Sequence, residues 1–102
     1  MIKVLAVLTA LPGRREELLK LFRANVPNVH AEAGCLEYQP FADVEGFPGV
    51  AAPLGPDTFV VVEAWADAAA LKAHMTAPHM VEYAKASKPL LAERKIHILT
   101  SA

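Results

Sequence analysis

The chain has 102 residues, which is the usual length of one domain. Hydrophobic residues make up 54% of it, above the ~45–50% of an average protein, and a single small core normally buries less than this. The net charge is −1, with both signs spread along the chain, which argues against binding to nucleic acid or to an anionic membrane. We therefore expect one domain over residues 1–102 that also buries apolar surface against another subunit.

The start of the chain and its cysteine content indicate a cytoplasmic protein. Lys3 and the apolar residues 4–8 loosely resemble a signal peptide, but the apolar run is short and no A-x-A-like cleavage site follows it. No apolar stretch reaches the ~20 residues that span a bilayer. The single cysteine, Cys35, has no partner in the chain, which favours a reducing compartment.

The hydrophobic pattern predicts four strands and three helical segments. The predicted strands cover residues 2–9, 35–41, 58–66 and 93–99, and the predicted helices cover residues 14–33, 68–75 and 78–88. Pro27 should kink or interrupt the first helix, and Gly34 is a typical stop for it. Asp67 is a good N-cap for the second helix, and Pro78 suits the first position of the third.

This order, βαββαβ, predicts an α+β ferredoxin-like fold, in which a four-stranded antiparallel sheet carries its helices on one face. Residues 42–57 form a long connection with three glycines and three prolines, and loops of this length are often functional. The first strand is apolar on both faces, which is typical of a strand covered on both sides. A second copy of the sheet would cover the open face in a two-fold homodimer.

The candidate chemistry gathers on the third strand and the helices after it. Glu63 and Trp65 are two residues apart on a strand and so point to the same face. His74 should face the sheet from the short helix. His79 begins the next helix, one turn before Tyr83, and the positive end of the helix dipole there disfavours a cationic ring.

Each of these residues also has an ordinary structural explanation. A histidine on an apolar helix face is commonly a satisfied core residue, and Glu63 could pair with a lysine. We interpret three other residues as structural: His30, Cys35 and His97. A metal site would use His74, His79 and Glu63, but the i, i+5 spacing of the histidines differs from the helical zinc motif, and we expect no metal.

Three segments resemble the antibiotic biosynthesis monooxygenase family, and within it the small bacterial quinol monooxygenase branch: EAGCLEYQPFADV, PDTFVVVEAWADAAALKAHMTAPHMVEYA and KIHIL. The pattern E-x-W-x-D followed by H-x-x-x-P-H-M is the most specific part of the likeness. The resemblance implies a dimeric α+β barrel. It also implies oxygenation of hydroquinones or polycyclic phenols by O2 without metal, flavin or haem.

On this reading, His74 or His79 takes a phenolic proton as a general base, and Glu63 orients a histidine by accepting its second N–H. The resulting anion passes an electron to O2, and radical recombination gives a peroxide that collapses to quinone and water. The residues expected to contact the aromatic substrate are Trp65, Tyr83, Tyr38 and Met80.

Two other functions stay open at this point. One is an isomerase of a small phosphorylated sugar-like metabolite, for which the nearby segments offer the cations Lys72, Lys85 and Lys88. The other is a non-catalytic dimeric module that binds aromatic metabolites. Oxygen dependence separates the first from a monooxygenase, and turnover separates the second.

Overall fold

The computed structural model describes all of residues 1–102. Its strands are β1 (Ile2–Ala10), β2 (Cys35–Phe41), β3 (Thr58–Trp65) and β4 (Leu91–Leu99). Its helices are α1 (Arg15–His30), α2 (Ala68–Thr76), α3 (Pro78–Ser87) and the short 3₁₀ turn η1 (Lys88–Leu90).

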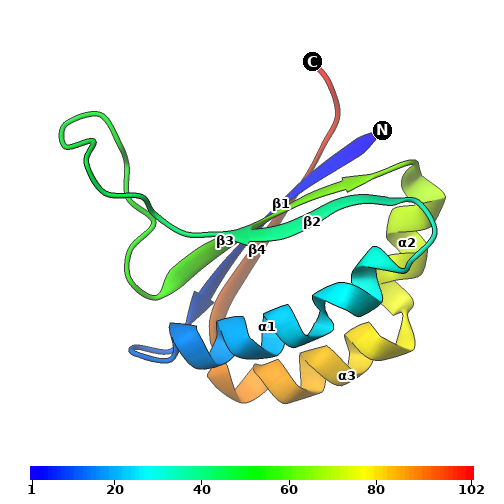
Figure 1. Cartoon of the computed structure of the whole chain (residues 1–102), viewed down its shortest axis with the longest axis horizontal. Coiled ribbons are helices and arrows are strands. Elements are labelled where there is room, and N and C mark those ends of the chain that lie inside the picture. The colour runs from blue at the N-terminus through cyan, green and yellow to red at the C-terminus, as the bar shows by residue number, and fades with distance from the viewer.

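The four strands form one antiparallel sheet in the order β2-β3-β1-β4, and the helices lie together on one side of it (Figure 1). This is the ferredoxin-like α+β arrangement, so the fold predicted from the element order is confirmed. None of the helices is both long and apolar enough to cross a membrane.

The face of the sheet that meets the helices is set by alternation along the two central strands. Val4, Ala6 and Leu8 of β1 are buried and lie opposite Glu63, Val61 and Phe59 of β3 in the register. Strand side chains alternate between faces, so these residues share the inner face. The inner face and the helices enclose the core, a cluster of 14 buried residues that includes Phe22, Phe59 and Trp65.

The first helix is shorter than its sequence pattern predicts. It ends at His30 rather than at residue 33, because a turn is needed before β2. Gly34 completes this turn with φ +80°, a conformation that favours glycine. A Cβ on Gly34 would also fall 2.6 Å from the Cβ of Ala70. Pro27 lies within the helix on its solvent side and does not end it.

The later helix signals are confirmed. The Asp67 carboxylate accepts a hydrogen bond from the Ala70 backbone N–H at 2.8 Å, which is the N-cap contact of α2. Pro78 is the first residue of α3. The last strand begins at Leu91, two residues earlier than predicted, since η1 brings the chain directly back to the edge of the sheet.

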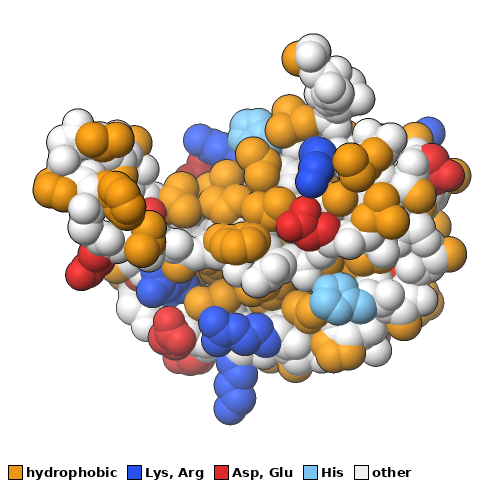
Figure 2. All heavy atoms as spheres, turned by 45° about the horizontal axis from the view of Figure 1, so that its top comes forward, with side chains coloured by type: hydrophobic (Ala, Val, Ile, Leu, Met, Phe, Trp, Pro, Cys, Tyr) orange, Lys and Arg blue, Asp and Glu red, His pale blue; other side chains and the backbone are white.

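The outer face of the sheet is apolar and uncovered. Leu5 and Val7 of β1 lie opposite Val62 and Val60 of β3, on the face away from the helices, and Leu5 is 37% exposed. Figure 2 shows hydrophobic side chains across this face and on the loop beside it. One chain alone therefore leaves one face of its central strands open to water.

Residues 42–57 form a projecting loop that stands away from the sheet (Figure 1). The Asp43 carboxylate closes its base by accepting hydrogen bonds of 2.9 Å from the backbone N–H groups of Leu54 and Gly55. These two hydrogen bonds hold the pKa of Asp43 below its ordinary value. Phe47 and Val50, further along the loop, are largely exposed.

Candidate active site

A cavity of about 680 Å³ lies between the inner face of the sheet and helices α2 and α3. Hydrophobic residues account for 15 of the 21 that line it. An apolar cavity of this size with a few polar groups is the usual form of a small-molecule site. Its polar lining includes His74 and Glu63, two of the residues singled out by the sequence.

His74 is almost completely buried, and its ring is held from three sides. Its Nδ1 lies 2.8 Å from Oε2 of Glu32. The ring centroid is 4.6 Å from that of Trp65 and 5.4 Å from that of Tyr38. A carboxylate only accepts hydrogen bonds, so the Nδ1 atom carries the proton and Nε2 keeps a free lone pair. Nε2 makes no hydrogen bond within the chain, and the ring lines the cavity.

The sequence predicts that Glu63 orients a histidine, but the structure gives this contact to Glu32. Glu63 instead accepts a hydrogen bond of 3.0 Å from Trp65 Nε1. The two side chains share a strand face, so the contact is local and the carboxylate faces its neighbour on β3. Burial raises the pKa of Glu63, and the hydrogen bond from Trp65 and the nearby His74 offset only part of this rise.

His79 lies behind His74 and away from the cavity. Its Nε2 is 3.2 Å from the same Glu32 oxygen, but the N–H does not point at the carboxylate, and both ring nitrogens are sealed from solvent without a hydrogen bond. A substrate in the cavity therefore meets His74 and not His79. The sequence gives both histidines equal standing as the base, and the geometry separates them.

The aromatic residues divide in the same way. The sequence predicts Trp65 as a wall of the site, but its side chain is 0% exposed and packs behind His74. Tyr38, Tyr83 and Met80, the other predicted substrate contacts, line the cavity. Burial raises the pKa of Tyr83 to about 12 and raises the pKa of Tyr38 even further, so both phenols stay protonated at neutral pH.

Glu32 is the functional residue that the sequence pattern missed. It lies in the turn after α1, and its side chain is only 15% exposed. Its contact with His74 joins positions 42 residues apart, which no local periodicity reports. The available hint is its place two residues before Gly34, within a turn that must pass close to α2.

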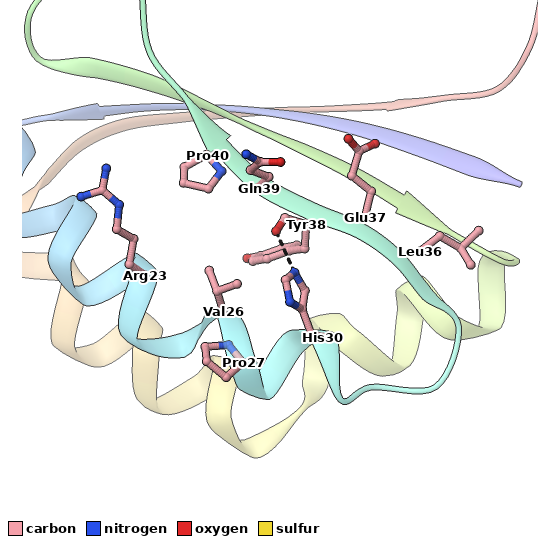
Figure 3. A pocket seen from close by; sticks show the side chains of 9 residues that line it. All are labelled: Arg23, Val26, Pro27, His30, Leu36, Glu37, Tyr38, Gln39 and Pro40. Carbon is pink, nitrogen blue, oxygen red and sulfur yellow. Dashed lines mark hydrogen bonds between the residues drawn. The ribbon is translucent and has the colours of Figure 1, made fainter.

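A second hollow, of about 630 Å³, lies outside this site in the groove between α1 and β2 (Figure 3). His30 projects from α1 across the groove, and its Nε2 is 3.0 Å from the backbone oxygen of Tyr38. That carbonyl belongs to the free edge of the sheet, and the next outward position on the edge is Pro40, which has no N–H. His30 and Pro40 thus protect this edge from pairing with another strand, which fits the structural role predicted for His30.

The remaining candidates for metal or thiol chemistry are not arranged for it. No group of three or more His, Cys, Asp and Glu side chains is placed to hold a metal ion. Partial burial raises the pKa of the Cys35 thiol, and the Glu32 and Glu63 carboxylates raise it further. Since only a thiolate is a strong nucleophile, Cys35 is a small apolar residue, as predicted.

Comparison with known proteins places this chain in a family. Residues 1–86 match the family described as antibiotic biosynthesis monooxygenase. The chain belongs to this family. A relative named probable quinol monooxygenase YgiN, from Escherichia coli strain K12, is 37% identical to this chain. The alignment is 102 residues long and covers 97% of this chain and 96% of the relative.

Solved structures share the fold of this chain. A crystal structure from Pseudomonas aeruginosa has a TM-score of 0.82 and 32% identity, and covers 99% of this chain and 93% of its own. A structure from Deinococcus radiodurans has a TM-score of 0.82 at 22% identity, with 100% and 93% covered, and shows the shared fold alone. The resemblance predicted from the sequence motifs is confirmed.

Proposed function

We propose that this protein is a monooxygenase that oxidises an electron-rich hydroquinone or polycyclic phenol with O2, using its own side chains and no cofactor. Membership of the antibiotic biosynthesis monooxygenase family and the name of the Escherichia coli relative, probable quinol monooxygenase, support this class of reaction. The observation that carries the proposal is His74, which opens on an apolar cavity and is held by the partly buried carboxylate of Glu32.

His74 is the general base in this proposal. A phenolic hydroxyl in the cavity gives its proton to Nε2, the ring atom that has no partner in the chain. Glu32, at 2.8 Å from Nδ1, fixes the ring orientation and stabilises the imidazolium that forms. Positioned acid–base catalysis of this kind contributes about 10²–10⁴ in rate. His79 and Trp65 support the ring from behind and do not touch the substrate.

The oxidation then proceeds on the substrate. The phenolate passes one electron to O2, which gives superoxide and an aryloxyl radical. The two combine through a C–O bond at a ring carbon that bears hydrogen, and the imidazolium returns its proton to form the hydroperoxide. Loss of water from this hydroperoxide leaves a ring carbonyl, so one oxygen atom stays in the quinone product and the other leaves as water.

The walls of the cavity suit this chemistry. Tyr38, Tyr83 and Met80 form apolar surfaces on which an aromatic ring can lie. Both tyrosines stay protonated at neutral pH and so do not compete with His74 as bases.

The test is oxygen consumption with 1,4-dihydroxynaphthalene in chelator-treated buffer, with autoxidation subtracted. We expect a protein-dependent rate that His74→Ala lowers by at least a hundredfold, while Lys20→Ala, an exposed control on α1, leaves it unchanged. With ¹⁸O2, one labelled atom should enter the quinone. A His74→Ala rate equal to that of the parent would refute the assignment of the base.

The same assay separates the other functions considered from the sequence. Turnover of a phosphorylated sugar without oxygen would favour the isomerase, and saturable binding of aromatic compounds without turnover would favour a binding module. The largely apolar lining of the cavity fits an aromatic ring better than a sugar, since a sugar's hydroxyl groups need hydrogen-bond partners.

We further propose that two copies of this single 1–102 domain form a cytoplasmic homodimer through the outer faces of their sheets. The exposed apolar residues there, Leu5 above all, support it, since large apolar patches on small proteins commonly mark interfaces. Sedimentation equilibrium should show a dimer, and Leu5→Lys should shift it to a monomer. A monomeric parent would contradict the homodimer, and recovery in a periplasmic fraction would contradict the location.

A further inference from the structure

The end of the cavity remote from His74 carries three cations. Lys85, Lys88 and Arg94 all line the cavity, and Glu63 is the one acidic residue among its lining residues. None of the three cations forms an ion pair within the chain. We call these three residues the cationic rim.

The sheet register separates the rim from the catalytic end. Arg94 of β4 lies opposite Leu8 of β1, whereas Glu63 of β3 lies opposite Val4. Four residues of strand separate these positions along β1, which is about 13 Å. The strand positions of Arg94 and Glu63, which mark the two ends of the cavity, are therefore separated by more than the length of one aromatic ring.

The cations face the cavity for local reasons. On β4, the residues opposite the inward-facing Leu8, Ala6 and Val4 are Arg94, Ile96 and Ile98, so Arg94 continues an apolar inner row. Its neighbour Lys95 points to the outer face and pairs with Glu93 at 3.5 Å. Lys85 and Lys88 are three residues apart near the end of α3 and so share a helix face.

We propose that the substrate is an aromatic hydroxy compound that carries an anionic substituent, with its phenolic end at His74 and its anion at the cationic rim. This inference rests on the proposed function for its catalytic end. A fused two-ring system that carries its hydroxyl and its carboxylate on opposite rings holds the two groups at opposite ends of the molecule, and the apolar residues between the two ends of the cavity contact the rings. The rim makes the protein select against neutral analogues of the same shape.

Equilibrium binding of compounds that the enzyme does not turn over tests the rim independently of oxidation. The probes are 6-hydroxy-2-naphthoate, whose hydroxyl and carboxylate lie at opposite ends of the fused rings, and its neutral analogue 2-naphthol, each measured under nitrogen by calorimetry. The parent should bind the carboxylate at least tenfold more tightly, since an ion contact of 4 Å in water corresponds to about fivefold per cation. Added 0.5 M salt should reduce this preference because the rim is exposed.

The triple variant Lys85→Gln, Lys88→Gln, Arg94→Gln should lose the preference and still bind 2-naphthol like the parent. Lys95→Gln, on the outer side of the same strand, is the matched control and should keep the preference. Equal binding of the two probes by the parent, or a triple variant that still prefers the carboxylate, would overturn the inference.

Parallel oxygen assays with 1,4-dihydroxynaphthalene distinguish this failure from failure of the proposed function. Oxidation of the neutral compound without any preference for the anion would reject the rim and keep the monooxygenase. If the parent prefers the anionic probe and the triple variant loses this preference, but 1,4-dihydroxynaphthalene is not oxidised, the rim is upheld as an anion site and the monooxygenase is rejected.

Discussion

Removal of the Glu32 carboxylate should lower the catalytic rate with little effect on substrate binding. Glu32 holds His74 through a hydrogen bond of 2.8 Å, but it is not among the residues that line the cavity. A substrate in the cavity does not touch it, so KM should change less than threefold. Glu32 orients the His74 ring and stabilises the imidazolium, so kcat should fall without it.

The size of the fall follows from the contact. A hydrogen bond to a charged group is worth about 1.5–3 kcal/mol, and each ~1.36 kcal/mol of activation free energy is a factor of ten in rate. Glu32→Ala should therefore lower kcat roughly 10- to 150-fold. Glu32→Gln keeps an acceptor oxygen without the charge, and its kcat should lie between those of the parent and the alanine variant.

The assay is steady-state oxygen consumption at 25 °C with 1,4-dihydroxynaphthalene. The alanine variant leaves a buried N–H of His74 without its partner, which costs about 1–3 kcal/mol of stability, so thermal unfolding must first show that it is folded at this temperature. Glu82→Gln, an exposed residue of α3, is the control and should match the parent. A folded Glu32→Ala protein with unchanged kcat, or one in which only KM rises, would refute the positioning of His74 by Glu32.

Two further predictions concern stability. Gly34→Ala should lower the melting temperature by more than Gly13→Ala. Both glycines have positive φ, for which the backbone cost of alanine is about 1–2 kcal/mol, but only a Cβ at residue 34 meets a neighbour, the Cβ of Ala70 at 2.6 Å. Equal losses of melting temperature in the two variants would contradict this prediction. Burial raises the pKa of Glu63 above the ordinary 4.5, so the native state binds this proton more tightly than the unfolded chain and loses stability as pH rises through the raised value. Glu63→Gln removes that loss, and its melting temperature relative to the parent should therefore increase from pH 4 to pH 8; a pH-independent difference, like the one expected for Glu82→Gln, would show that the carboxyl is not perturbed.

The cavity and the proposed dimer interface lie on opposite faces of the sheet. The cavity opens between α3 and the inner side of β4, where Ile96 and Ile98 are still 46% and 55% exposed. The proposed interface is on the opposite, outer face of the sheet. Leu5→Lys should therefore dissociate the dimer without changing any residue that lines the cavity.

Local patterns in the sequence determined the elements and their order. Alternation along the strands, the N-cap at Asp67 and the prolines and glycines between segments act over a few residues. The structure confirms the elements that they predict, although α1 ends three residues earlier and β4 begins two residues earlier than expected. The order βαββαβ then leaves few ways to form one antiparallel sheet with short connections. The motif around Glu63, Trp65 and His74 carried the family, because it lies in one continuous stretch of chain.

Only the tertiary structure decided what each site residue contacts. Glu32 reaches His74 because the turn at Gly34 passes against α2, and Arg94 reaches the cavity because the register of β4 places it opposite Leu8. These contacts join segments far apart in sequence. Periodicity along the chain predicts the face of the helix or strand on which a residue lies, but not which residues of other elements lie opposite it. For the same reason, the sequence could name two histidines, but only the structure shows that His74 lines the cavity and that His79 does not.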